Sequence, residues 1–101
     1  MTFNKVTKTL TCVGGTASVN IPYQRGIANL IYVSPATETT EWDLQIIDPD
    51  SITVRHYQSE VGTYRDGEQL PLWGIHTLTI ENSTNATEVF TIKFIIDDRI
   101  G

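Results

Sequence analysis

The chain has 101 residues, of which 40% are hydrophobic, and seven Lys and Arg against twelve Asp and Glu give a net charge of −5. This length fits one domain, residues 1–101, with a single modest core. Because the chain lacks the excess of cations that a nucleic-acid backbone or an anionic membrane requires, we expect neither as a partner.

The first predicted strands flank a pair of glycines. Residues 8–13 and 16–21 alternate apolar and polar side chains, and Gly14 and Gly15 lie between them. Glycines readily supply the positive φ angles of a tight turn. We therefore predict a hairpin in which these two strands pair with each other.

The next run, residues 27–33, is apolar at consecutive positions rather than alternate ones. A strand of this kind is covered on both faces, either by the rest of the domain or by another subunit. We take the run as a candidate interface between copies of the chain, with Ile27, Leu30, Ile31 and Tyr32 as its contact residues.

Two further strands are predicted around a turn. Residues 42–47 place a tryptophan and two aliphatic side chains on one face, which we expect to be core. Residues 48–51 combine a proline at the second position of a β-turn with an Asp that can accept from the following backbone. Residues 52–57 then form the second strand of a hairpin.

The middle of the chain is less regular. Residues 62–68 predict a short strand or an extended loop. In residues 70–74, a proline and a glycine interrupt an apolar segment, and we predict a plug that covers one end of the core. Leu70, Leu72 and Trp73 are therefore candidate interface residues, and Trp73 is the exposed aromatic we expect as an anchor.

The last two strands are predicted at residues 75–81 and 89–96, joined by a polar loop as a hairpin. The first places His76 on an apolar face, which favours a hydrogen-bonded core histidine over a metal ligand. The second has bulky apolar residues at every even position. About seven turn-linked strands predict an all-β fold, an antiparallel sandwich, with a small barrel as the alternative.

Residues that carry chemistry form no recognisable catalytic or metal-binding pattern. His56 and His76 are far apart in the sequence, and Cys12 stands alone, so it cannot form an intrachain disulfide. Neither a nucleophile elbow nor a phosphate-binding glycine loop occurs. We predict a protein that is not an enzyme, with no catalytic residues, cofactor or metal.

Aromatic residues offer one alternative function. Trp42, Tyr57, Tyr64 and Trp73 could stack on sugar rings, as in small β-sandwich lectins. This keeps a glycan among the candidate partners and a carbohydrate-binding or adhesion module among the candidate functions.

Three segments are similar to segments of phage structural proteins: residues 42–46, the turn at 64–67, and the stretch 70–78 with Leu-Pro-Leu-x-Gly-Ile-x-Thr-Leu. In these segments the chain resembles small β-sandwich virion proteins of tailed bacteriophages. It also resembles them in composition, because it is acidic and rich in Thr, Asn and Ile. The likeness spans about half of the chain and transfers no binding residue.

The resemblance implies a capsid decoration or cement protein, or alternatively a tail-associated protein. Its partners would be copies of itself and a major capsid or tail protein, and its location the virion, after synthesis in the host cytoplasm. Absence of an apolar N-terminal segment and of a membrane-spanning run agrees with that location.

Overall fold

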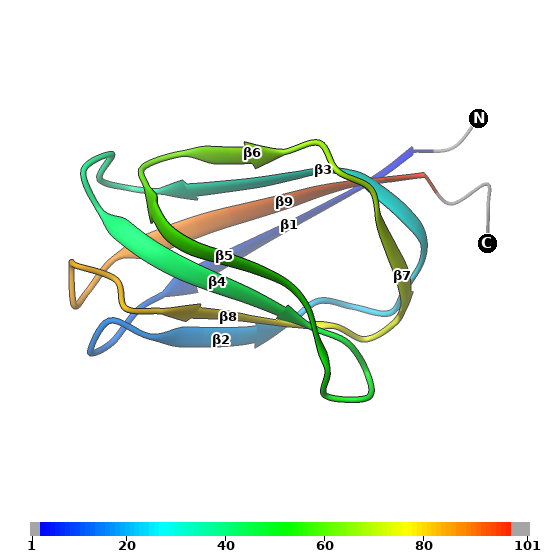
Figure 1. The fold of residues 1–101 in the computed structure, drawn as a ribbon, viewed down its shortest axis with the longest axis horizontal. Coiled ribbons are helices and arrows are strands. Elements are labelled where there is room, and N and C mark those ends of the chain that lie inside the picture. The colour runs from blue at the N-terminus through cyan, green and yellow to red at the C-terminus, as the bar shows by residue number, and fades with distance from the viewer. Residues whose placement is uncertain (1–2, 98–101) are drawn as a thin grey trace.

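The computed structural model of the protein describes residues 3–97, and all of their regular structure is β-strand (Figure 1). The predicted antiparallel sandwich is confirmed, because two antiparallel sheets pack face to face. The strands are β1 (Phe3–Thr11), β2 (Ala17–Asn20), β3 (Gln24–Pro35), β4 (Glu41–Ile47), β5 (Thr53–Val61), β6 (Tyr64–Asp66), β7 (Leu70–Gly74), β8 (Thr77–Glu81) and β9 (Val89–Asp97).

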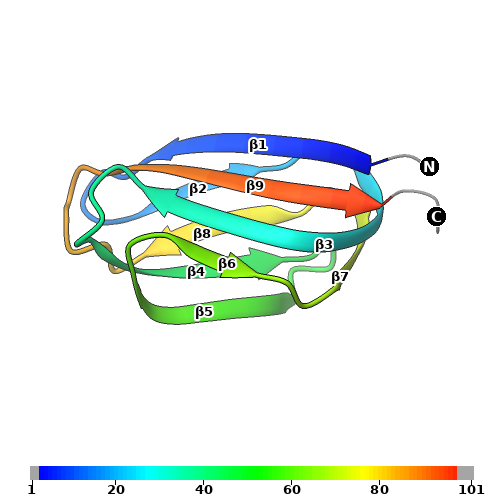
Figure 2. The same ribbon diagram turned by 90° about the horizontal axis from the view of Figure 1, so that it is seen from above.

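The two sheets differ in size. The five-stranded sheet has the order β1-β9-β3-β6, and β7 also pairs with β3; the four-stranded sheet has the order β2-β8-β4-β5. Figure 2 shows β1, β9 and β3 side by side in one layer. β3 is long enough to pair with β7 along Gln24–Ala28 and with β6 along Ile31–Val33. Within residues 3–97, no helix is long and apolar enough to span a membrane.

The core lies between the sheets and follows the alternation of the sequence. The even-numbered positions of β9 from Phe90 to Ile96 are fully buried, as predicted. From the other sheet, β4 contributes Trp42, Leu44 and Ile46, which are also fully buried. The indole Nε1 of Trp42 donates to the Gly62 carbonyl oxygen at 2.9 Å, which satisfies its buried polar atom.

Two predicted hairpins are wrong, because their turns carry the chain from one sheet to the other. β1 pairs with β9 and β2 pairs with β8, although Gly14 and Gly15 do form a turn with positive φ. β8 and β9 likewise lie in different sheets. The two crossing loops bond to each other, because the Gly15 N–H donates to the Ala86 carbonyl and the Ser83 N–H donates to that of Gly15. Turn chemistry predicts a reversal, but it does not choose the pairing partner.

The predicted β4–β5 hairpin is confirmed. Asp48 Oδ1 accepts from the backbone N–H groups of Asp50 and Ile52 at 2.9 Å each, which fixes the turn. The segment predicted as an irregular plug is instead the regular strand β7. Pro71 is tolerated there because β7 pairs only with β3, which leaves its other side unpaired within the described residues.

A charged cluster closes one edge of the sandwich. Asp66 on β6 accepts from the hydroxyl of Tyr57 on β5 at 2.5 Å and forms an ion pair with Arg55. The backbone N–H of Glu68 donates to the other carboxylate oxygen of Asp66 at 2.8 Å. Burial raises the pKa of Asp66, but these donors outweigh burial and lower it overall. The cluster links β6 of one sheet to β5 of the other.

His76 is fully buried, as predicted, but the expected hydrogen bond is absent. Within the described residues neither ring nitrogen has a partner, and the Gly74 backbone lies near the ring outside hydrogen-bond geometry. The ring instead contacts Trp73 edge to face, with centroids 5.4 Å apart. Burial lowers the pKa of His76, and Gly74 and Asp48 oppose this shift only in part. Folding therefore favours the neutral form of the His76 imidazole.

We expect the stability of the protein to fall as the pH drops below the unfolded pKa of histidine, about 6.5. At a pH between the two pKa values of His76, the unfolded chain binds a proton and the folded chain does not. The contribution of His76 to the free energy of unfolding is therefore complete above about pH 6.5 and decreases as the pH falls toward the lower, folded pKa. Urea unfolding at about pH 7.5 and about pH 5 measures the loss. His76→Phe should remove it, whereas His56→Gln, at an exposed position, should keep it. An unchanged loss in His76→Phe would contradict this assignment.

Candidate functional site: a basic face on the five-stranded sheet

The outer face of the five-stranded sheet carries a continuous row of side chains across four strands. Thr7 on β1 lies opposite Lys93 on β9, Lys93 opposite Tyr32 on β3, and Tyr32 opposite Arg65 on β6. Directly opposite side chains in an antiparallel pair lie close together on one face. The row therefore brings two cations to the two sides of one tyrosine.

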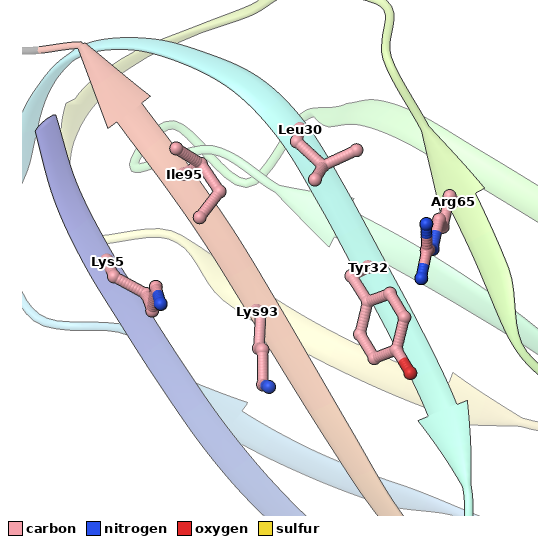
Figure 3. Close-up of a pocket in the computed structure, with 6 residues that line it drawn as sticks. All are labelled: Lys5, Leu30, Tyr32, Arg65, Lys93 and Ile95. Carbon is pink, nitrogen blue, oxygen red and sulfur yellow. The ribbon is translucent and has the colours of Figure 1, made fainter.

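A neighbouring row adds a third cation and an apolar floor. Lys5 lies opposite Ile95, and Ile95 lies opposite Leu30. The two rows enclose a hollow of about 320 Å³, and Figure 3 shows the side chains that line it. These are Lys5, Leu30, Tyr32, Arg65, Lys93 and Ile95.

Tyr32 is the centre of the site. The Arg65 Cζ lies 5.4 Å from the centre of the Tyr32 ring, and the Lys93 Nζ lies 5.6 Å from it. Both distances are within the range of cation–π attraction, worth about 0.5–1 kcal/mol at exposed sites. The ring thus has a cation on each of two sides, and this local positive charge favours a bound anion.

The charge of this face is opposite to that of the whole chain. Three of the seven Lys and Arg line the hollow, and none of its lining residues is acidic in the part of the chain that the structure describes. By the strand register the face ends at Asp97, whose side chain is buried. A local positive potential on an acidic protein favours an anionic group at this place.

The arrangement is suited to binding rather than to covalent chemistry. Its donors are two lysine ammonium groups, a guanidinium and a phenol, and Arg can hold a carboxylate by two parallel hydrogen bonds. Cys12, the one nucleophilic thiol of the chain, is buried, and burial raises its pKa. Residues 3–97 contain no group of three His, Cys, Asp or Glu side chains placed to hold a metal ion.

The structure places the predicted interface residues in three different environments. Tyr32 and Leu30 line the hollow, and the outer side of β3 is half-buried within the single chain. Ile31, Leu70 and Leu72 are buried in the core, so they are not available on the surface. The remaining two lie away from the hollow.

Ile27 is half-buried and pairs with Pro71 on β7. Trp73, which is 45% exposed, lies on β7 opposite Arg25. Sequence reasoning missed Lys5, Arg65 and Lys93, which lie on three different strands. Their outward positions could be read from the alternation, but only the pairing of distant strands shows that they meet.

No family model matches the chain, and no curated protein matches it. A search of solved structures finds, among its matches, PliG from Aeromonas hydrophila, a periplasmic lysozyme inhibitor of g-type lysozyme. The match has a TM-score of 0.50 and 10% sequence identity and covers 92% of this chain and 85% of that one. At this identity it shows a shared fold and transfers no binding residue. The protein that shares the fold is an inhibitor, not an enzyme.

This finding corrects the interpretation drawn from the resemblance. A virion structural protein of tailed phages is contradicted, because a solved structure that shares this fold is a bacterial inhibitor. The same finding contradicts the tail-associated alternative, which is also a phage virion protein. The three segments that carried the resemblance lie in β4, in β6 with the turn after it, and in β7 to β8.

Proposed function

We propose that the protein is a non-catalytic binding protein that captures an acidic segment of a partner protein on the basic face. The observation that carries this proposal is the gathering of Lys5, Arg65 and Lys93 around one hollow, with Arg65 and Lys93 against the Tyr32 ring, in a chain of net charge −5. Tyr and Arg are enriched at the centres of protein interfaces, and a mixed apolar and cationic surface suits a carboxylate-bearing chain.

A protein partner agrees with the charge of the molecule better than a polyanion does. A nucleic acid or an anionic membrane is large enough to interact with the net negative charge that the twelve Asp and Glu give the chain, and not only with the hollow. Long-range repulsion would therefore oppose binding. A short acidic segment meets only the local cations. A protein-binding function also agrees with PliG, in which this fold belongs to an inhibitor of another protein.

Titration with a glutamate decapeptide, followed by calorimetry, tests the proposal. We expect binding at an ionic strength of about 0.01 M, and loss of binding at about 1 M, where the Debye length shrinks to about 3 Å. Replacing Lys93 and Arg65 by glutamate should weaken binding at least about tenfold, or about 1.4 kcal/mol.

The matched control is Arg25→Glu. Arg25 is exposed on the same strand as Tyr32, but it lies opposite Trp73 and outside the hollow. We expect this variant to bind the glutamate decapeptide within about twofold of the wild type. Equal weakening by Arg25→Glu, or equal binding of a lysine decapeptide, would contradict a specific basic site.

A further inference from the structure

The outer face of the four-stranded sheet is acidic. Glu41 and Asp43 point outward from β4, and Glu81 on β8 lies directly opposite Asp43. Among the described residues, the outward positions of β2, β4 and β8 carry no Lys or Arg. Like charges directly opposite across a strand pair destabilise a sheet, so this pairing costs stability.

Two of these carboxylates are held in place. Asp43 accepts from the Ser59 backbone N–H at 2.7 Å and from the Asn82 amide at 2.8 Å, and the two donors lower its pKa. Glu81 accepts from the Gln45 amide at 2.6 Å. The acidic face thus presents carboxylates held in place on a rigid sheet, which reduces the entropy lost on binding.

We infer that the acidic face of a second copy of this chain is the partner of the basic face. The inference rests on the proposed function and names its partner. The two faces have opposite charge, one with three cations lining the hollow and the other with Glu41, Asp43 and Glu81. Complementary potentials favour encounter and fix the orientation of partners.

The geometry determines the kind of assembly. The two faces are the outer sides of two packed sheets, so they point in opposite directions (Figure 2). A contact between different faces is head to tail, and it produces a row or a ring of copies rather than a closed dimer. With molecular extents of 38, 25 and 19 Å, a sheet face is of the same order as the roughly 800 Å² that each partner buries in a standard interface.

The edge strand β1 competes poorly with this contact. β1 is an edge strand of the five-stranded sheet. Lys5 lies on its outer side, and half-buried Lys8 lies on its inner side together with the core residue Leu10. Charged residues on an edge strand, above all those that point inward, oppose pairing with another sheet. Face-to-face contact is the association that the charges favour.

Native mass at low and high ionic strength, measured on the wild type and two neutralised variants, tests the inference. One variant carries Lys93→Gln and Arg65→Gln, and the other carries Glu41→Gln and Glu81→Gln. We expect the wild type to exceed its monomer mass of 11.3 kDa at low ionic strength and to dissociate in salt. Each variant alone should associate at least about tenfold more weakly.

Mixing the two variants gives the sharpest result. Each retains one native face, so the mixture should form a one-to-one dimer that grows no further. A wild type that stays monomeric overturns the inference. If that monomer still binds the glutamate decapeptide, the proposed function stands with another partner; if it does not, both fail. Variants that associate like the wild type overturn the assignment of the two faces.

Discussion

Phe94→Ala should cost about 3–5 kcal/mol of the free energy of unfolding, a large part of the about 5–15 kcal/mol typical of a domain. Phe94 is fully buried on β9, the strand that lies between β1 and β3. It lies opposite Val6 on one side and Ile31 on the other, so its ring sits in the middle of the five-stranded sheet. Truncation leaves a cavity that regular strands on both sides cannot collapse to fill. Urea unfolding measures the loss.

Thr91→Ala on the same strand is the matched control. Thr91 lies on the outer face, where it is half-buried, and its removal should change stability by no more than about 0.5 kcal/mol. A loss of less than about 1 kcal/mol in Phe94→Ala would show that β9 does not occupy the centre of the core.

Asp66→Ala should cost roughly 3 kcal/mol, because it leaves three donors without their acceptor. The Tyr57 hydroxyl is buried away from bulk solvent, and the Arg55 guanidinium loses its ion pair. The backbone N–H of Glu68 loses its acceptor as well. Since these contacts join β5 to β6, the edge of the sandwich should open first, and hydrogen exchange should rise there before it rises in β9.

A double-mutant cycle separates the hydroxyl from the rest of the cluster. In a Tyr57→Phe background, Asp66→Ala should cost less, because no buried hydroxyl is left without a partner. Glu68→Ala, which removes an exposed carboxylate two residues away, should stay within about 0.5 kcal/mol of the wild type. Equal losses for Asp66→Ala in both backgrounds would contradict the coupling of Asp66 to Tyr57.

The fold class could be predicted from the sequence, because alternation at residues 42–47 and 89–96 directly reflects which side chains face the core. The order of strands could not. Gly14 and Gly15 indicate a turn whether the chain stays in one sheet or crosses to the other. β7 was missed as a strand because Pro71 lowers the local signal, while pairing with β3 overrides that preference.

The candidate site depends on this missing information. Tyr32 and Leu30 stood out as large apolar residues, but a hydrophobic run predicts burial and hides the outward side of the strand. Lys5, Arg65 and Lys93 are ordinary surface cations in the sequence. They become a site only when β1, β9, β3 and β6 lie side by side, and that order is set by long-range pairing.

Binding of an acidic segment to the basic face should be visible in the amide chemical shifts of the ¹⁵N-labelled protein during titration with the glutamate decapeptide. We expect the shifts to concentrate on the strands that carry Lys5, Tyr32, Arg65 and Lys93, and to disappear at high ionic strength. Shifts that spread over the four-stranded sheet or the loops, or none at all, would contradict it.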